Sequence, residues 1–341
     1  MDMTTKEQVK VLWKQCFEDS ESFVDLYFKK RYNDEINAVI ERDGGIVSAF
    51  QMIPYTMNFC GKIIPLSYIS GACTHPVYRR QGVMGELLAK THREMYLGGS
   101  WLSFLIPAND GLFDYYAKWG YESVFNYSLQ IRQADDLLAS PLYSIVDETD
   151  EHDFMAEHYR YFSNRIKNRS CCVLHSREDL EVVLEDLRLV NGKLLIARRC
   201  GLIHGMAFCV KDENRVLIKE MFADNNVVKD SLMKEASLIF QTDEVACMQL
   251  PLLNPKCLGM ARVLQVEKML TLFASKYSSV EWRLQVEGDE AIPENNDFFV
   301  VSKGKCVRGR LKDHVYHLCT INQLTRLLFA RETPYMSLMI D

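Results

Sequence analysis

One segment of the sequence combines arginine and glycine in a pattern that suits a bound anion. Residues 73–85 read CTHPVYRRQGVMG, so an apolar run ends, a proline turns the chain and an amphipathic stretch follows. The first turn of a helix presents unpaired N–H groups and about half a positive charge. Gly82 lets the backbone approach a ligand closely, and Arg79 and Arg80 add formal charge. The segment therefore predicts a cradle for a pyrophosphate at the start of a helix.

Two familiar phosphate-binding motifs do not describe this loop. It lacks the Lys-Ser/Thr pair of a P-loop and the G-x-G-x-x-G of a dinucleotide site. Taken by itself, an R-R-x-G match also describes a loop with two solvated arginines that begins an ordinary helix. The spacing alone leaves this second interpretation open.

A second segment carries two adjacent phenols. Residues 114–121 read DYYAKWGY, with Tyr115 and Tyr116 on a predicted helix that Gly120 ends. A phenol with a pKa near 10 can donate a proton to a departing group and so act as a general acid. A tyrosine on an amphipathic helix can equally pack its ring in the core and leave its hydroxyl at the surface. The residues alone do not choose between these roles.

The elements around these segments follow a mixed α/β order. Capping residues and helical spacing predict helices near residues 4–17 and 20–30. Turn signals at 43–45 and 60–62 then join three strands, and a helix, a strand, a short helix and a last strand follow to about residue 133. This order predicts an α/β (α+β) unit in which the basic loop lies between a strand and a helix.

The middle of the chain repeats this pattern in outline. Residues 40–52 read IERDGGIVSAFQM and residues 196–208 read IARRCGLIHGMAF. The aligned identities are Ile40/Ile196, Arg42/Arg198 and Gly45/Gly201. Residues 222–226, before the corresponding helix, contain no Arg and no Gly, and Asp224 would repel pyrophosphate. We therefore expect the second copy to be structural, or a wall of the substrate cleft.

The last third of the chain has a different pattern. Residues 251–277 predict a loop and then a helix, and the sequence continues as strand, acidic turn, strand and a last helix. Apolar positions of the first helix are Met260, Val263, Leu264, Val266 and Leu270. A chain of 341 residues exceeds the size of one ordinary core, so two or three domains are expected.

Composition excludes several classes of function. The net charge is −6, from 46 acidic and 40 basic residues without a Lys/Arg block, so we expect no nucleic-acid partner. The uncharged stretch 44–61 is rich in strand formers, so we expect no membrane span. Eleven cysteines without a C-x-x-C pair indicate free thiols of a cytoplasmic protein. His314 and His317, three apart in a strand-like run, would point to opposite faces, so no metal site is predicted.

The basic loop and the element order together resemble the GNAT superfamily of N-acyltransferases. The superfamily's acetyl-CoA motif is R/Q-x-x-G-x-G/A, here Arg79-x-x-Gly82-x-Met84, and the sequence departs from it at Met84. The enhanced-intracellular-survival (Eis) type tolerates a bulky residue there and favours H-P-x-x-R-R-x-G, which residues 75–82 match. The internal repeat, the run MARVLQVEKML and the hairpin VEGDEAIPENNDFFVV also look like that type.

The resemblance implies tandem GNAT-like mixed sheets flanked by helices, followed by a sterol-carrier-like α/β domain. Residues 1–133 would form the catalytic GNAT acetyltransferase domain, residues 134–250 a degenerate second GNAT-like domain, and residues 251–341 the sterol-carrier-like domain. The family tends to self-associate, so a homo-oligomer is a further implication.

The resemblance also implies acetyl-CoA as co-substrate and gives individual residues a role. The strand before the loop would hold the pantetheine arm through its backbone, and the loop would hold the pyrophosphate. Asn109 would bind the cofactor amide, although helix capping by Asn109 or Asp110 is an alternative. The general acid would be Tyr116, four residues before Gly120, with Tyr115 as its competitor. The implied cofactor-binding residues are Ala72, Cys73, Thr74, Arg79, Arg80, Gln81, Gly82, Val83, Met84, Gly85 and Asn109.

A general base is also required, because an amine with a pKa near 10.4 is neutral only about once in 10³ molecules at pH 7. The Eis-like type uses the chain-terminal carboxylate, which here is that of Asp341. A free terminus normally frays, but the run TPYMSLMID is apolar, which indicates burial. Asp25, Glu35 and Glu41 are other acids that the sequence does not rank.

The expected function is acetyl-CoA-dependent transfer of an acetyl group to a primary amine of a small molecule or peptide by direct attack. Cys73 could be a nucleophile, but its strand position favours backbone pairing or packing. The alternatives are a CoA-binding or a lipid-binding module without catalysis. The identity of the amine lies in cleft side chains that the sequence does not expose.

Overall fold

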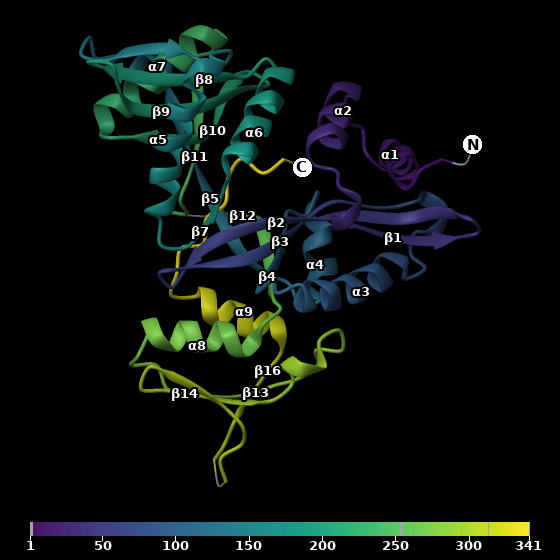
Figure 1. The fold of residues 1–341 in the computed structure, drawn as a ribbon. Coiled ribbons are helices and arrows are strands. Elements are labelled where there is room, and N and C mark those ends of the chain that lie inside the picture. Colours follow the sequence, from purple (N-terminus) through teal and green to yellow (C-terminus); the bar gives the residue numbers. More distant parts are fainter. Residues whose placement is uncertain (1–2, 253–254, 313, 341) are drawn as a thin grey trace. The chain divides into compact units, whose positions relative to one another are not determined.

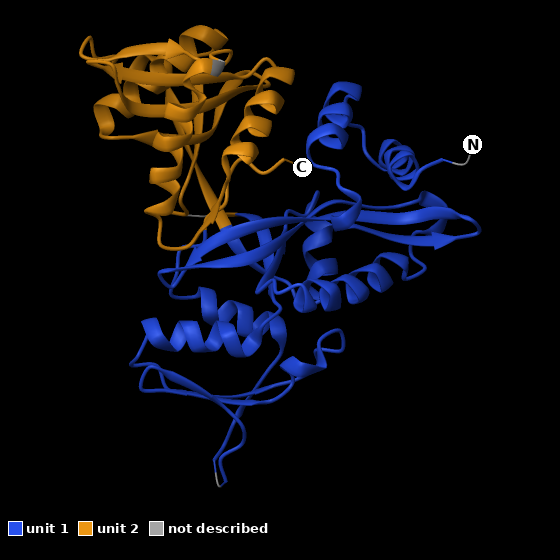
Figure 2. Ribbon diagram, in the orientation of Figure 1, with its two compact units in different colours: residues 1–125, 257–334, 341 blue, residues 126–256, 335–340 orange. Residues whose placement is uncertain are grey.

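The computed structural model describes residues 3–252, 255–312 and 314–340. The chain divides into two compact units, drawn in different colours in Figure 2. Unit 1 comprises residues 1–125, 257–334 and 341, and unit 2 comprises residues 126–256 and 335–340. Each unit therefore contains segments that are far apart in the sequence.

Unit 1 is built on a mixed sheet with the strand order β1-β2-β3-β4-β12-β5. Helices α1 and α2 lie on one side of the sheet, and α3 and α4 lie on the other (Figure 1). The bounds of these elements are α1 Thr5–Cys16, α2 Glu21–Lys30, β1 Asn37–Arg42, β2 Gly45–Phe59, β3 Lys62–Thr74, α3 Val83–Leu97, β4 Leu102–Leu105, α4 Asp110–Ala117, β5 Glu122–Gln133 and β12 Lys256–Val263.

Strand β12 corrects one sequence prediction. Met260 and Val263 were expected on a helix, but residues 256–263 form a strand, and 260–263 pair antiparallel with 102–105 of β4. The helix begins only at Val266. A short apolar run fits a buried strand or a helix equally well. Here the run becomes a strand because it pairs with β4, which lies far away in the sequence, and fills the position between β4 and β5 in the sheet.

The remainder of unit 1 is a four-stranded sheet of order β15-β14-β13-β16, covered on one face by two helices (Figure 1). Helix α8 packs on β14 and β15. The bounds are α8 Val266–Lys276, β13 Trp282–Val286, β14 Phe298–Ser302, β15 Lys305–Arg308, β16 His317–Cys319 and α9 Ile321–Phe329. Only His317 of the two noted histidines lies in a strand, so the expected strand over both is wrong.

Unit 2 repeats the design, with α7 packed on β8, β9 and β10. Its strands follow the order β6-β8-β9-β10-β11, and the second half of β5 pairs antiparallel with β11. The bounds are β6 Ser144–Asp147, α5 Met155–Lys167, β7 Cys172–Leu174, α6 Arg177–Leu189, β8 Lys193–Arg199, β9 Leu202–Asp212, β10 Arg215–Ala223, α7 Asn226–Phe240 and β11 Glu244–Gln249.

Each unit contains a hairpin with the same turn conformation and the same register shift. Asp43-Gly44 and Cys200-Gly201 form turns in which both residues have positive φ, 52° and 78° in the first and 49° and 78° in the second. Each hairpin also has a register shift four residues before its turn glycine, after Ile40 and after Ala197. Gly201 therefore corresponds to Gly44, and the sequence alignment with Gly45 was one residue out of register. The α/β class and the tandem repeat are confirmed.

Candidate functional site

A bulge in β3 opens the sheet of unit 1 beside the basic loop. Ser70 pairs with Gln51 and Cys73 with Ala49, so Gly71 and Ala72 together face Phe50. Gly71 has φ +65°, and a Cβ there would lie 2.0 Å from the ring of Trp13, so only glycine fits. The sequence analysis missed this residue, although a lone glycine inside a strand-forming run is the usual sign of a bulge.

Strands β3 and β4 separate after Tyr68, shortly before the bulge. Their parallel pairing covers 66–68 and 102–104, and within the described residues no pair between these strands follows Tyr68. Cys73 and Thr74 pair with β2 on their other edge, and the side chain of Cys73 is buried. The backbone of residues 72–74 thus has no described strand paired on its β4 side, although the Thr74 carbonyl already accepts from Arg79 Nε. The Cys73 side chain packs, as the strand position predicted.

The start of α3 is an uncapped helix end. Gly82 is the N-cap with φ +83°, it makes no side-chain cap, and the space around its Cα is open. The first helical hydrogen bond runs from the Glu86 N–H to the Gly82 carbonyl at 2.9 Å, so the N–H groups of residues 83–85 precede it. A helix end of this kind attracts an anion through its free N–H groups and its dipole.

Three side chains of the loop have different surroundings. Arg79 Nε donates to the Thr74 carbonyl at 3.0 Å, and Gln81 Nε2 donates to the Val77 carbonyl at 2.8 Å. Arg80 is exposed with φ +62°, and no described residue forms an ion pair or hydrogen bond with it. Arg79 and Gln81 therefore shape the loop, and Arg80 is the cation left for a ligand.

The remaining residues of the cradle contribute backbone rather than side chains. Val83 is buried in the core and Met84 is half-buried against it. Gly85 is also buried, and a Cβ there would lie 2.3 Å from the Trp119 ring, so this glycine allows close packing of α3 on that ring.

Tyr116 lies on the buried side of α4, and Tyr115 is half-buried beside it. Burial, with smaller contributions from Tyr115 and Cys73, raises the pKa of Tyr116 well above its ordinary value. Within the described chain no hydrogen bond engages its hydroxyl, whereas Tyr115 interacts with the Trp119 side chain. Tyr116 is thus a protonated phenol whose O–H is not committed to another residue, as a general acid requires.

Asn109 is the N-cap residue of α4 by its backbone, but its side chain makes no capping hydrogen bond. The exposed Asn109 amide is therefore not used for helix capping, the alternative that the sequence left open. The three other acids considered as a base are surface residues, and Asp25 forms an ion pair with Lys10 at 2.6 Å.

Asp341, the predicted base, lies outside the described residues, but the segment before it is held in unit 2 by several hydrogen bonds. Tyr335 and Ser337 donate to buried Glu220, each at 2.6 Å. The Tyr335 carbonyl accepts from the Val173 N–H at 3.0 Å, and His175 Nε2 lies 2.9 Å from the Ser337 carbonyl. Tyr335, Met336 and Ile340 are buried, which confirms the burial expected from the apolar tail.

The corresponding helix end in unit 2 is closed. Asn225 caps α7, and its Oδ1 accepts from the Val228 N–H at 3.0 Å. Asp224 precedes it and is paired with Arg165 and, at 2.8 Å, with His204. A side-chain oxygen therefore occupies the place that Gly82 leaves open, and an acid directly precedes this cap, where unit 1 has Gln81.

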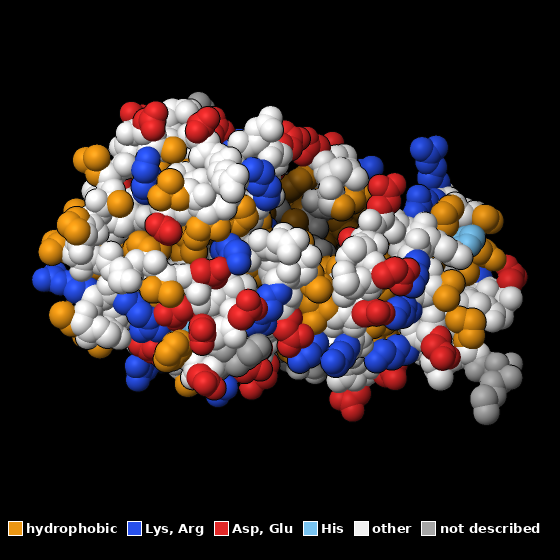
Figure 3. Space-filling view, turned by 90° about the horizontal axis from the view of Figure 1, so that it is seen from above, with side chains coloured by type: hydrophobic (Ala, Val, Ile, Leu, Met, Phe, Trp, Pro, Cys, Tyr) orange, Lys and Arg blue, Asp and Glu red, His pale blue; other side chains and the backbone are white. Residues whose placement is uncertain are grey.

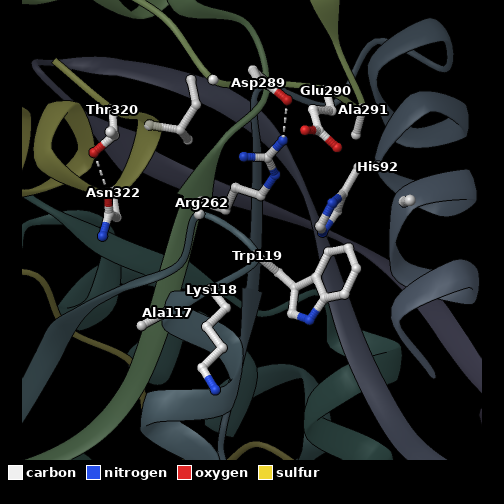
Figure 4. Close-up of a pocket in the computed structure, with 14 residues that line it drawn as sticks. His92, Ala117, Lys118, Trp119, Arg262, Asp289, Glu290, Ala291, Thr320 and Asn322 are labelled. Atoms are coloured by element: carbon white, nitrogen blue, oxygen red, sulfur yellow. Dashed lines mark hydrogen bonds and ion pairs between the residues drawn. The ribbon is translucent and has the colours of Figure 1, made fainter. Parts of the chain in front are cut away.

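A separate cavity of about 650 Å³ lies in unit 1 between α3, the end of α4 and the loop 288–291 (Figure 4). Its wall carries a buried ion pair of Arg262 and Asp289, joined at 2.6 Å. His92 and Trp119 face the cavity, and the Thr320 hydroxyl lies 2.5 Å from Asn322 Oδ1. The cavity does not include residues of the basic loop.

The described surface shows no segregation of charge on the face drawn in Figure 3, where acidic and basic side chains are interspersed. Within residues 3–252, 255–312 and 314–340 no group of three or more His, Cys, Asp or Glu side chains could hold a metal ion. Over the same part of the chain, every helix is too short or too polar to cross a bilayer.

Residues 2–124 match the family model of the acetyltransferase (GNAT) domain. No curated protein matches the chain. A conserved protein of unknown function from Enterococcus faecalis, described as a probable N-acyltransferase, is similar in structure, with TM-score 0.74, 18% identity and coverage of 95% of this chain and 87% of that one.

Two further solved structures share the fold. A GCN5-related N-acetyltransferase from Anabaena variabilis has TM-score 0.73, 18% identity and coverage of 96% of both chains. Eis1 from Mycobacterium abscessus has TM-score 0.72, 10% identity and coverage of 96% of this chain and 88% of that one. Likeness at these identities establishes the fold along nearly the whole chain.

Proposed function

We propose that this chain, a GNAT acetyltransferase with the Eis-like tandem fold, moves an acetyl group from acetyl-CoA to a primary amine of a small molecule or peptide. The observation that carries the proposal is the combination, within unit 1, of an uncapped helix end, an unpaired strand edge and a protonated phenol. These three features suit the pyrophosphate, the pantetheine and the leaving thiol of one extended cofactor.

The parts of the cofactor would meet different groups of the chain. Gly82, the N–H groups of residues 83–85 and the Arg80 guanidinium would hold the pyrophosphate. The backbone of 72–74 would pair with the amides of the pantetheine arm, with the Asn109 side chain as a further partner. Arg79 and Gln81 would keep the loop in shape through their own hydrogen bonds.

The reaction would be a direct attack without a covalent enzyme intermediate. The amine nitrogen adds to the thioester carbonyl, the new C–N bond forms, the C–S bond breaks and a thiolate leaves. Tyr116 would protonate that thiolate, and its raised pKa keeps the proton on the phenol at neutral pH until then. Cys73 is buried and donates from Sγ to the Ala49 carbonyl at 3.7 Å, which disfavours a nucleophilic role.

We propose that the base is the α-carboxylate of Asp341. The anchoring of 335–337 on Glu220 supports this role, because an ordered tail can deliver its terminal carboxylate at a fixed place. Unit 2, whose own helix end is closed by Asn225, would then serve to hold the tail rather than a second cofactor.

The remaining assignments follow from the same proposal. The segments 1–133, 134–250 and 251–341 would be the catalytic, the degenerate and the sterol-carrier-like domains, and self-association in the cytoplasm is expected from the family likeness. We also propose that the protein acts without a nucleic-acid partner, without membrane attachment and without a metal ion.

The deciding experiment is release of CoA from acetyl-CoA against a panel of primary amines, including aminoglycosides and lysine peptides. Turnover with at least one amine is expected. Binding of CoA by calorimetry without turnover on any amine would favour a binding module. An acyl chain recovered from the purified protein would instead favour a lipid carrier.

A further inference from the structure

Two thiols meet beside the basic loop of unit 1. Cys16 is the last residue of α1 and is half-buried, and its Sγ donates to the Thr74 carbonyl at 3.4 Å. Cys73, which precedes Thr74, is buried; its Sγ donates to the Ala49 carbonyl at 3.7 Å, and its side chain also interacts with that of Cys16. The ends of α1 and of β3 therefore hold a pair of cysteines in contact.

A cation completes the group. Arg79 Nε donates at 3.0 Å to the same Thr74 carbonyl that accepts from Cys16. The guanidinium thereby lies next to the Cys16 sulfur and interacts with it. A positive charge and an S–H donor both favour the thiolate form of a cysteine.

The pKa of Cys16 differs in direction from that of two other thiols of the chain. The Cys73 hydrogen bond and the Arg79 charge lower the pKa of Cys16 to about 6. Burial raises the pKa of Cys306 to about 11 and that of Cys60 to about 12. Cys16 is thus the more acidic thiol of the pair and is partly accessible, and its hydrogen bond to Thr74 belongs to the protonated form. The hydrogen bond with Cys16 and burial raise the pKa of Cys73, which keeps its proton.

We propose that Cys16 is a thiol-modification site that reacts with small-molecule disulfides, and that Cys73 resolves the product into a Cys16–Cys73 disulfide. The proposal is independent of the acetyl-transfer activity, because it uses only the contact of the two sulfurs, the Thr74 carbonyl and Arg79.

The chemistry balances in two exchange steps. The Cys16 thiolate attacks one sulfur of the small disulfide, whose S–S bond breaks, and one small thiolate leaves. Cys73 then loses its proton to solvent and attacks Cys16 Sγ, which expels the second small thiolate. Overall, two protein thiols are oxidised to one disulfide, and the small disulfide is reduced to two thiols.

The first test is the pH dependence of labelling by iodoacetamide, read by peptide mass spectrometry. A Cys200→Ser/Cys257→Ser background removes the two exposed thiols and leaves Cys306 as an internal control. At pH 6.0 a thiol of pKa about 6 is half thiolate, and one of pKa about 11 is thiolate about once in 10⁵ molecules. After allowance for the weaker nucleophilicity of the more acidic thiol, Cys16 should react about 10²-fold faster than Cys306.

A plot of the Cys16 labelling rate against pH should bend near pH 6. In an Arg79→Gln variant the bend should move to a higher pH, because the charge that stabilises the thiolate is lost. Fully buried Cys209 should stay unlabelled in the same digests, which shows that the protein is folded. A bend near the ordinary thiol value of about 8.5, or labelling of Cys16 no faster than that of Cys306, would overturn the proposal.

The second test uses oxidised glutathione on the same background. The intact protein should lose the mass of two hydrogens, with Cys16 and Cys73 linked in one non-reduced peptide pair. A Cys73→Ser variant should instead accumulate glutathione on Cys16. A glutathione adduct that persists on Cys16 while Cys73 is present would refute its resolving role, and no adduct in either protein would refute the site.

Discussion

Replacement of Tyr116 by phenylalanine tests the proposed acid with little structural disturbance. The side chain is only 6% exposed, its ring packs with Tyr115 and Tyr121, and no described residue uses its hydroxyl. Loss of the oxygen therefore breaks no internal hydrogen bond, and we expect a change in unfolding free energy of less than about 1 kcal/mol. General acid catalysis is typically worth about 10²–10⁴ in rate, or about 2.7–5.4 kcal/mol of transition-state stabilisation.

The assay is CoA release at saturating acetyl-CoA, with calorimetry for cofactor affinity. Tyr116→Phe should lower kcat by about 10²–10⁴ and leave CoA affinity nearly unchanged. Because the pKa of Tyr116 is raised, the wild-type kcat profile should show no loss of the acid form up to about pH 10. Tyr115→Phe is the matched control, since it removes the neighbouring hydroxyl. Full activity of Tyr116→Phe, or a large loss in Tyr115→Phe alone, would refute the assignment.

Four further predictions concern the cradle, the bulge and the tail. Arg80→Glu should weaken CoA binding by about 10–150-fold in calorimetry, the value of one charge-assisted hydrogen bond, while Asp224→Asn in unit 2 should not change it. Gly71→Ala should destabilise the fold by at least about 1–2 kcal/mol in denaturant unfolding, because φ +65° and the Trp13 ring both oppose a Cβ. Tyr335→Phe should cost about 1.5–3 kcal/mol, because it removes a donor from buried Glu220. Deletion of Met339 to Asp341 should abolish turnover and spare CoA binding, and full activity of the truncated protein would exclude the terminal base.

The parts of the fold that were predictable from the sequence are those written in local signals. Asp43-Gly44 makes a tight hairpin turn because both residues adopt positive φ, and Thr4 starts α1 with a capping box to Glu7. The proline of the basic loop and Gly82 likewise mark the passage from β3 to α3. In each case the conformation is decided by residues within a few positions of one another.

The parts that could not be predicted depend on partners far away in the sequence. Residues 256–263 become a strand because β4, whose paired residues lie 155 to 161 positions earlier, offers them an edge. Nothing in their own pattern excludes a helix. The pairing of Cys16 with Cys73 and Arg79 likewise needs the packing of α1 on β3. Local propensity carries no information on such contacts.

The contrast between the two helix ends shows how a few side chains can leave open or close the start of a helix on one backbone framework. Both units retain the hairpin, its bulge and the following strand and helix, so the backbone framework is common to them. In unit 1 the helix begins with Gly82, which leaves the N–H groups and the dipole unopposed. In unit 2 the Asn225 side chain takes up one of those groups, and the Asp224 carboxylate is held by Arg165 and His204. An anion approaching α7 would have to displace a cap and meet a like charge, so these side chains oppose anion binding there without any change of fold. The same unit holds Tyr335 and Ser337 on Glu220, so its framework anchors the tail segment in place of presenting an open helix end.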